Sequence, residues 1–265
     1  MMLDGVSAVV AGGAGGLGGA TVAHLVGLGA GVVVLDPDAD RSAALVATLG
    51  ERARAVEGTA NDDGQVAAAI AAARELGRFS IAVSATGVVI RSQRTVSEGG
   101  EMLPVDVLAK NLELHVVGPF NLARHAAAAF AANEPDADGQ RGVVVLTASI
   151  SAFDGQVTMV PYAAAKGAVV SMTLPMARDL APLGVRVCSI APGGFVTPRL
   201  SDPRVQALIA EDVQFPRRLG RPEEFAMLVE AIVRNPYLNG EVIRIDGAAR
   251  LSAEMGRGFM PSRTD

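Results

Sequence analysis

The sequence has few aromatic residues, few lysines and a single cysteine. Tryptophan is absent from the 265 residues, and aromatic residues make up only 4% of them. The core must therefore be built from valine, isoleucine, leucine and alanine, with small residues that allow close packing. Of the 23 basic residues, all but Lys110 and Lys166 are arginines. A lysine kept in such a chain is a hint that its ammonium group matters.

Several classes of protein are excluded or disfavoured by what is missing. Cys188 is the only cysteine, so no disulfide can form within the chain, which is typical of a reducing compartment. We find no basic leader before the first apolar segment and no apolar run long enough to span a bilayer. The net charge of −5 gives no reason to expect a nucleic-acid or membrane partner. We therefore expect a soluble, cytoplasmic protein that acts on small molecules.

Short, nearly continuous apolar runs alternate with alanine-rich helical segments along the chain. This alternation predicts an α/β fold, a doubly wound Rossmann fold with a mostly parallel, seven-stranded sheet and helices on both faces. The predicted strands are Val6–Ala11, Val32–Leu35, Ala53–Glu57, Ser80–Ser84, Gly142–Thr147, Val185–Ile190 and Glu241–Ile245. The predicted helices are Leu17–Leu28, Arg41–Leu49, Asp63–Leu76, Val105–Ala132, Tyr162–Leu183 and Pro222–Arg234.

We expect a single nucleotide-binding domain over residues 1–255, followed by a tail, 256–265, without a usable pattern. The least patterned internal stretches are Val88–Pro104 and Pro192–Pro216. In doubly wound folds, long loops at the carboxyl ends of strands bind the substrate, so both stretches are candidates for that role.

A glycine-rich turn follows the first predicted strand and opens the first predicted helix. Two registers fit it: Gly13, Gly15 and Gly18 match G-x-G-x-x-G, while Gly12, Gly16 and Gly18 match G-x-x-x-G-x-G. In either register the missing Cβ atoms permit a tight turn and a close approach of a pyrophosphate to the helix N-terminus. An ordinary turn in a glycine-rich chain is the alternative interpretation.

Asp36 ends the second predicted strand, where an acidic side chain would accept hydrogen bonds from the adenosine ribose of NAD. A surface aspartate that opens a turn before Pro37 is the alternative. The carboxylate would repel the 2′-phosphate of NADP, and the nearest cation, Arg41, is placed one turn into the next helix. The sequence therefore favours NAD over NADP.

Tyr162 and Lys166 stand four residues apart on a predicted helix, with three alanines between them, so they share one face. An ammonium beside a phenol stabilises the phenolate and lowers the tyrosine pKa from about 10, which would let the phenol exchange a proton near neutral pH. Ser149 follows the fifth predicted strand and could hydrogen-bond the same substrate oxygen. Two unrelated residues on a helix surface are the alternative for the tyrosine and the lysine.

From Val6 to about Leu251 the chain resembles the short-chain dehydrogenase/reductase family. The matching motifs are Gly12-x-x-x-Gly16-Leu17-Gly18, the set Ser149, Tyr162 and Lys166, and Ile190-Ala191-Pro192-Gly193 followed by Thr197-Pro198. Within the family, the stretches Ser151–Gln156, Met172–Pro182 and Asn235–Ala248 resemble the type 2 3-hydroxyacyl-CoA dehydrogenases, which also act on hydroxysteroids.

The resemblance implies reversible hydride transfer between NAD and a secondary alcohol. Tyr162 would be the acid/base, Lys166 would tune it, and Ser149 would orient the substrate oxygen. The implied cofactor-binding residues are Gly12, Gly15, Gly16, Leu17 and Gly18 at the pyrophosphate turn, Asp36 at the adenosine ribose, Thr59 and Ala60 at adenine, Ala85 and Gly87 at the ribose wall, and Tyr162, Lys166, Phe195 and Thr197 around the nicotinamide. The resemblance also implies a homotetramer.

Four positions depart from the family pattern. Ala11 replaces a threonine, Thr59 replaces an aspartate, and Ser84-Ala85-Thr86-Gly87 replaces Asn-Asn-Ala-Gly. His115 stands where the family has its catalytic asparagine, whose backbone carbonyl holds a water molecule of the proton relay. The imidazole could fill the space of the asparagine, could impair the relay, or could join the relay itself.

We therefore expect an NAD-dependent enzyme that acts on 3-hydroxyacyl-CoA or on a related secondary alcohol. The alternatives are a nucleotide-binding homologue with weak or no activity, and a ketoacyl or hydroxysteroid reductase. No spacing of metal ligands is present, and His24 and His125 are interpreted as ordinary helix residues.

Overall fold

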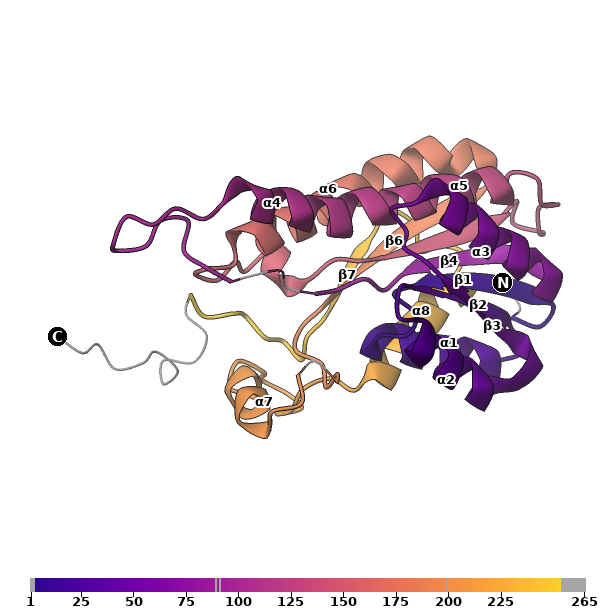
Figure 1. Ribbon diagram of the computed structural model, residues 1–265. Helices are drawn as coiled ribbons and strands as arrows, with labels where there is room; N and C mark the ends of the chain where they lie inside the picture. Colours follow the sequence, from indigo (N-terminus) through magenta and orange to yellow (C-terminus); the bar gives the residue numbers. More distant parts are fainter. Residues whose placement is uncertain (1–2, 89, 91, 199, 254–265) are drawn as a thin grey trace.

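The structure is a computed structural model that describes residues 3–88, 90, 92–198 and 200–253. Within these residues the strands form one seven-stranded sheet in the order β3-β2-β1-β4-β5-β6-β7 (Figure 1). The strand pairs are parallel throughout, which confirms the predicted doubly wound fold. The strands are β1 Val6–Ala11, β2 Gly31–Asp36, β3 Ala53–Glu57, β4 Arg78–Ser84, β5 Gly142–Thr147, β6 Val185–Pro192 and β7 Val242–Ile245.

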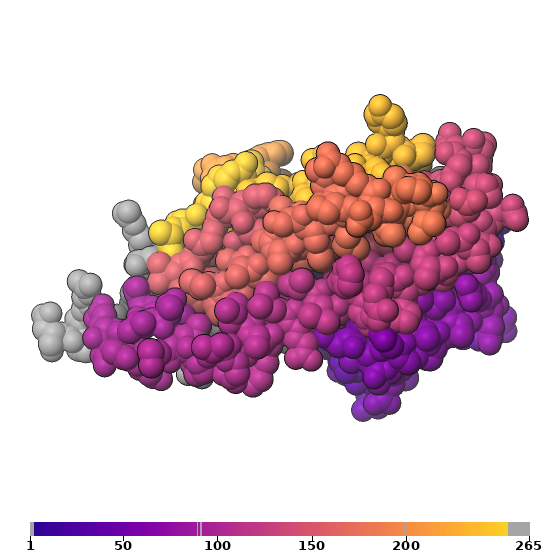
Figure 2. Space-filling view, turned by 90° about the horizontal axis from the view of Figure 1, so that it is seen from above, coloured from indigo at the N-terminus to yellow at the C-terminus, as the bar shows by residue number. Residues whose placement is uncertain are grey.

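Helices cover both faces of the sheet, as the apolar character of its central strands requires. Helices α3, α5 and α6 bury one hydrophobic cluster on one face, and α1, α2 and α8 bury a second cluster on the other (Figure 1). Seen from above, α4, α5 and α6 make up most of the visible surface (Figure 2). The helices are α1 Gly16–Gly27, α2 Ala39–Leu49, α3 Asp63–Leu76, α4 Val105–Leu112, α5 Gly118–Phe130, α6 Val160–Leu180, α7 Pro203–Ala210 and α8 Pro222–Arg234.

The segment predicted as one helix, Val105–Ala132, is interrupted. Between α4 and α5 the chain makes a π-helical turn over Glu113–Val117, in which the amide of Gly118 donates to the carbonyl of Glu113. The Asn61 side-chain amide donates to the same carbonyl across 2.8 Å. Such single π turns arise from one residue inserted into an α-helix, and they occur frequently at functional sites. The interruption places His115 inside the turn.

One helix was not predicted at all. Helix α7 lies within Pro192–Pro216, which the sequence pattern left as a loop. Asp202 caps it by accepting from the amide of Arg204 across 2.8 Å, and Pro203 occupies its first turn. Both are ordinary helix-start signals, but the helix has only eight residues and buries no side chain completely.

Long connections emerge from the carboxyl ends of the strands, as expected. Between β4 and α4 the chain forms a projecting hairpin in which Val96 pairs antiparallel with Met102, and α7 lies at the same end of the sheet (Figure 1). The strand order reverses between β1 and β4, and in this fold class ligands bind in the crevice at that point. In the described part of the chain, no helix combines the length and apolar character needed to cross a bilayer. The predicted tail 256–265 lies outside the described residues.

Candidate active site

Apart from Tyr162 and Lys166 on α6 and His115 in the π turn, the candidate residues lie at or just after the carboxyl ends of strands. The glycine-rich turn follows β1, Asp36 ends β2, and Ser149 follows β5. Because the strands are parallel, these ends meet at one edge of the sheet. The remaining candidates are Thr59 and Ala60 after β3, Ala85 and Gly87 after β4, and Phe195 and Thr197 after β6.

The glycine-rich turn packs so tightly that side chains are excluded. A Cβ atom on Gly18 would lie 2.1 Å from the carbonyl oxygen of Gly12, and one on Gly16 would lie 2.8 Å from Cγ2 of Thr197. Gly12 itself has φ of +72°. The segment after β6 therefore lies directly against the first turn of α1. No side chain caps that helix, and no acidic residue lies in its first turn, so its N-terminal amides are free to bind an anion.

The carboxylate of Asp36 is held by the backbone around it. One oxygen accepts from the amide of Ala14 across 3.1 Å, and the other accepts from the amide of Asp38 across 3.0 Å. The side chain therefore links β2 to the glycine-rich turn. A carboxylate has about four lone-pair positions, so each oxygen keeps capacity to accept from a ribose hydroxyl.

The loop after β3 is fixed by polar side chains on both sides. The amide of Thr59 donates to Oε1 of Gln65 across 2.7 Å, and Nδ2 of Asn121 donates to the carbonyl of Ala60 across 2.9 Å. Since Asn61 also holds the π-helical turn, this loop joins the proposed adenine side of the site to the segment that carries His115.

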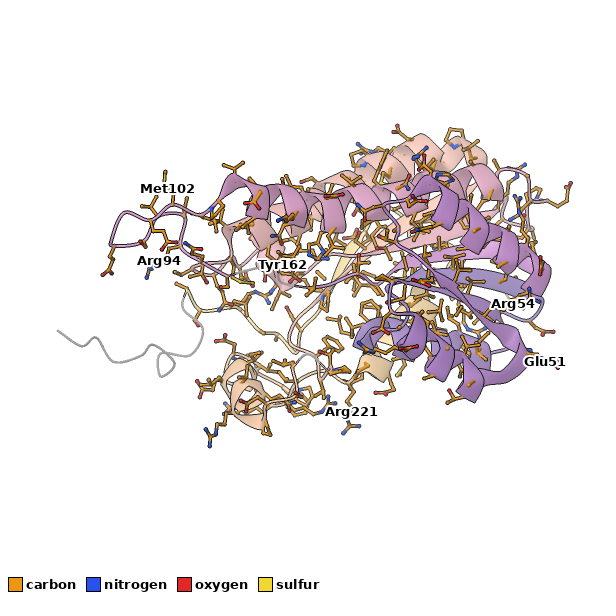
Figure 3. The ribbon with its side chains drawn as sticks, viewed as in Figure 1. Glu51, Arg54, Arg94, Met102, Tyr162 and Arg221 are labelled. Carbon is orange, nitrogen blue, oxygen red and sulfur yellow. The ribbon has the colours of Figure 1, made fainter. Side chains whose placement is uncertain are left out.

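Ser149, Tyr162 and Lys166 meet at the end of β5. Nζ of Lys166 donates to the carbonyls of Thr147 and Thr86 across 2.7 and 3.1 Å, and it lies 5.8 Å from the centroid of the Tyr162 ring. Figure 3 places Tyr162 between the hairpin that carries Arg94 and Met102 and the body of the sheet.

Burial dominates the electrostatics of this pair. It lowers the pKa of Lys166 to about 7 and raises the pKa of Tyr162, while the hydrogen-bonding Ser149 hydroxyl opposes the rise. The expectation that the phenol has a lowered pKa is therefore not met in this structure. The reason is that the phenol is partly removed from solvent, and desolvation disfavours its charged form.

The segment after β4 is joined to β1 and β5 mainly through its backbone atoms. The carbonyl of Ser84 accepts from the hydroxyl of Thr147 across 2.6 Å, which joins β4 to β5, and the hydroxyls of Ser84 and Thr86 lie 3.2 Å apart. The amide of Ala85 donates to the carbonyl of Ala11 across 2.8 Å. The first and third of these contacts use backbone atoms of the segment and therefore do not require asparagine side chains, whereas the second is a local pair of hydroxyls.

His115 is fully buried next to Tyr162. The two rings are nearly perpendicular, at 88°, with centroids 5.4 Å apart, and Nε2 of His115 lies 2.8 Å from the carbonyl oxygen of Val88. Burial, assisted by the Lys166 charge, lowers the pKa of the imidazole to about 3. The imidazole is therefore neutral at physiological pH. His115 also lies within the π-helical turn that separates α4 from α5.

Two further candidates have very different surroundings. The Phe195 side chain is buried and packs edge-on against Phe225, with ring centroids 6.4 Å apart. Gly87 is exposed, and a Cβ atom there would meet nothing within 4 Å.

Sequence reasoning missed several groups that hold the site. The carbonyls of Thr86, Val88 and Thr147, and the side chain of Asn61, position Lys166, His115 and the π turn. A backbone carbonyl has no sequence signature, but the polar Asn61 beside a predicted helix start was visible. Within the described ranges, no three His, Cys, Asp or Glu side chains are arranged to bind a metal.

Three separate segments meet at the loop that precedes Tyr162. The amide of Gln93 donates to the carbonyl of Thr158, which ties the hairpin after β4 to the loop that precedes Tyr162. On its other side, this loop is tied to the end of the described chain. Nε2 of Gln156 donates to the carbonyl of Ser252 across 3.0 Å, and the amide N–H of Val157 donates to the carbonyl of Ala253 across 2.9 Å.

Comparison with known proteins decides the family. The sequence profile described as short chain dehydrogenase matches residues 7–206. The chain belongs to this family. It is 44% identical over 252 residues to 3-hydroxyacyl-CoA dehydrogenase type-2 of Homo sapiens, covering 94% of this chain and 97% of the relative. This enzyme is therefore an oxidoreductase, and the resemblance predicted from its motifs is confirmed.

Solved structures agree with this assignment. The crystal structure of 3-hydroxyacyl-CoA dehydrogenase type-2 from Mycobacterium avium superposes with a TM-score of 0.92 at 44% identity, covering 94% of this chain and 98% of that one. A 3-ketoacyl-(acyl-carrier-protein) reductase from Brucella melitensis, complexed with NADH, gives a TM-score of 0.83 at 24% identity, covering 94% and 100%. At that identity the second comparison speaks for the fold alone.

Proposed function

We propose that this enzyme transfers a hydride between NAD and a secondary alcohol or ketone, with a 3-hydroxyacyl-CoA as the substrate. The observation that carries the proposal is the grouping of the buried Ser149 and Lys166 with the half-buried Tyr162 at the end of β5. A phenol, a hydroxyl and an ammonium in one enclosed place suit proton exchange with a substrate oxygen.

The residues around the point where the strand order reverses, between β1 and β4, are suited to binding a dinucleotide. The turn at Gly12, Gly16 and Gly18 leaves no room for a Cβ atom, and the N-terminus of α1 has no capping side chain. These features suit a pyrophosphate. Asp36 presents a carboxylate at the end of β2 and would repel a 2′-phosphate, which supports NAD over NADP. NAD would supply the hydride acceptor for alcohol oxidation and, when reduced, the hydride donor for the reverse reaction.

The chain's own residues would handle the proton. In alcohol oxidation the phenolate oxygen of Tyr162 would take the proton from the substrate hydroxyl, and the carbon that bears this hydroxyl would give up its hydrogen as a hydride, so a ketone and a neutral phenol result. The Ser149 hydroxyl orients the substrate oxygen. The ammonium of Lys166, near the phenol ring, stabilises the phenolate before transfer. Ketone reduction uses the same groups in reverse, with Tyr162 as the acid.

Two observations favour a second candidate, a nucleotide-binding homologue with weak or no activity. Burial raises the pKa of Tyr162, and His115 replaces the relay asparagine of the family. A ketoacyl or hydroxysteroid reductase is the remaining alternative, because the substrate class is supported only by similarity to relatives of that name.

A cofactor-coupled absorbance assay tests these alternatives. The protein is mixed with NADH or NADPH and with acetoacetyl-CoA, an acyl-carrier-protein analogue or a ketosteroid. Oxidation of NADH with acetoacetyl-CoA supports the proposal, whereas oxidation of NADPH alone overturns the NAD assignment. Measurable binding of NADH without turnover of any ketone favours the binding protein.

We further propose that the enzyme is a cytoplasmic homotetramer. The family resemblance suggests assembly through α5 and α6, and both helices carry exposed apolar side chains such as Phe120 and Leu174. Sedimentation equilibrium tests the assembly, since a monomer at micromolar concentration would contradict it.

A further inference from the structure

Ser149 stands at the start of a short turn that follows β5. The turn is a single 3-10 turn over Ile150–Ala152. The hydroxyl oxygen of Ser149 accepts from the amide of Ser151 across 3.1 Å, as the side chain of an N-cap residue does. The turn closes at Asp154, whose amide donates to the carbonyl of Ile150 across 2.9 Å. The position of the Ser149 hydroxyl is therefore linked to the position of Asp154.

A guanidinium from strand β7 binds the far end of this turn. Nη2 of Arg244 donates to Oδ2 of Asp154 across 2.6 Å and to the carbonyl of Ala249 across 3.0 Å. Nε of Arg244 donates to Oδ2 of Asp246 across 2.8 Å. The guanidinium also lies 5.2 Å from the centroid of the Phe153 ring. The arginine thus joins the turn after β5 to the segment that follows β7, which is distant in the sequence.

A small apolar cluster packs between the same two segments. It consists of the buried side chains of Ile150, Val213 and Ala249, and the partly buried Leu251 packs against it. Ile150 directly follows Ser149 in the chain, while Val213 belongs to the loop after α7. Apolar contacts and the guanidinium therefore hold the same turn from two sides.

The charges of this contact are largely removed from water. The exposed fraction is 21% for the Arg244 side chain, 19% for that of Asp154 and 7% for that of Asp246. The hydrogen bond from Arg244 holds the pKa of the Asp154 carboxyl below its usual range, so the two groups are charged at neutral pH. A planar guanidinium can bind several acceptors at once, whereas a lysine ammonium cannot reproduce that geometry. The contact therefore requires arginine rather than a positive charge alone.

We propose that Arg244 is a positioning residue of the active site, which holds the turn after β5 through Asp154 and thereby fixes the Ser149 hydroxyl where it meets the substrate oxygen. The inference rests on the proposed function for the use of Ser149 in turnover. The hold itself belongs to the protein without cofactor or substrate, and it can be measured there. The hydrogen bonds of Arg244 reach none of the residues proposed to bind the nucleotide.

Hydrogen exchange measures the hold without any turnover. Arg244→Gln removes the charge and the planar donors, and Asp154→Asn removes the charge at the other end. Peptides that cover residues 149–157 should exchange about threefold faster in both variants, with Arg244→Lys between them and the parent. Arg54→Gln is the matched control, because Arg54 lies on β3 at the opposite end of the strand order and pairs with Glu75. This control should exchange at the parental rate over 149–157.

A second measurement reports whether the Ser149 hydroxyl moves. This hydroxyl opposes the rise in the pKa of Tyr162, so its loss should raise the midpoint of tyrosinate formation. Tyr162 and Tyr237 are the only tyrosines, and tryptophan is absent, so a Tyr237→Phe background leaves an absorbance signal from Tyr162 alone. In rapid pH jumps, Arg244→Gln should shift the midpoint upward, as Ser149→Ala does. The two changes combined should shift it no further than Ser149→Ala alone.

Turnover gives the third measurement. Arg244→Gln should lower kcat/KM for the ketone by about 10- to 100-fold, while the Kd for NADH stays at the parental value. In a Ser149→Ala background the same substitution should cost less than about threefold, because the group that it positions is already absent. Thermal melting identifies any variant that fails to fold, and in that case Arg244→Lys and Asp154→Asn carry the comparison.

Parental exchange over residues 149–157 in Arg244→Gln would overturn the proposal, because the turn would not depend on the guanidinium. An undiminished loss of kcat/KM in the Ser149→Ala background would overturn it as well, since Arg244 would then act on another group. If the protein turned over no ketone at all, the proposed function would fail, yet the exchange rates and the Tyr162 midpoints would still decide the role of Arg244.

Discussion

The ammonium of Lys166 donates to the carbonyl oxygen of Thr147 across 2.7 Å, at the carboxyl end of β5. The most buried cation of the site is thus fixed by the backbone of the sheet rather than by a carboxylate. Within the described ranges no carboxylate forms an ion pair with it, and burial lowers the lysine pKa to about 7. The lysine charge therefore depends on pH in the physiological range.

This burial predicts a pH dependence of stability. From about pH 7 to about pH 10 the unfolded state holds the Lys166 proton and the folded state does not, so the free energy of unfolding gains up to about 1.4 kcal/mol per pH unit from this residue as the pH rises. We expect Lys166→Met to lack this gain. Urea unfolding of parent and variant across that range measures the difference. Lys110→Met is the matched control, because Lys110 is exposed. A parent and a Lys166 variant with the same pH dependence would contradict the prediction.

Replacement of Tyr162 by phenylalanine should abolish turnover. The change removes the hydroxyl that exchanges the proton, and we expect kcat to fall by at least about 100-fold. NADH binding, measured by fluorescence titration, should persist because the glycine-rich turn and Asp36 are untouched. Tyr237→Phe, at an exposed position, should retain full activity. Undiminished turnover in Tyr162→Phe would remove this residue from the mechanism.

Two neighbouring glycines of α1 should respond in opposite ways to alanine. A Cβ atom on Gly18 would lie 2.1 Å from the Gly12 carbonyl oxygen, whereas one on Gly19 would have no neighbour closer than 3.6 Å. Gly18→Ala should therefore distort the turn, lower the melting temperature and abolish NADH binding. Gly19→Ala should bind NADH normally and gain up to about 1 kcal/mol of stability from helix propensity. Equal binding by the two variants would mean that the turn does not hold the cofactor.

The choice between cofactors should depend on Asp36. We expect Asp36→Ser to reduce the preference for NAD over NADP by at least about tenfold, because the repulsion of the 2′-phosphate disappears. The ratio of kcat/KM for the two cofactors measures this change. Asp40→Ser, at an exposed position four residues later, should leave the ratio as it is. If the Asp36 variant kept the parental ratio, another residue would have to select the cofactor.

The strands and most helices were predictable because their signals are local. Strands such as β1 and β5 are continuous runs of small and β-branched residues that lie buried on both faces. Their predicted bounds match the structure. The glycine-rich turn and the pair Tyr162 and Lys166 were predictable for a similar reason, since fixed spacing next to a strand or on a helix determines where their atoms lie.

The π turn and the backbone carbonyls that bind Lys166 were not predictable from the sequence. Inserting one residue into a helix changes the hydrogen bonding between Glu113 and Gly118 but leaves an apolar pattern that still looks helical. The carbonyls of Thr86 and Thr147 act through the backbone, so their side chains carry no signal. The raised pKa of Tyr162 also depends on enclosure by segments that are distant in the sequence.

The hydrogen bonds from Gln156 and Val157 to Ser252 and Ala253 tie the last described residues to the loop that precedes Tyr162. The hairpin after β4 is tied to the same loop through Gln93 and Thr158. The proposed nucleotide-binding groups therefore lie at the edge of the sheet and the proposed proton-transfer groups on α6 and after β5, while the segments that flank the loop before Tyr162 come from two remote points of the chain. Sequence changes in the hairpin or in the C-terminal segment can alter which molecules are admitted without disturbing the groups that react with them.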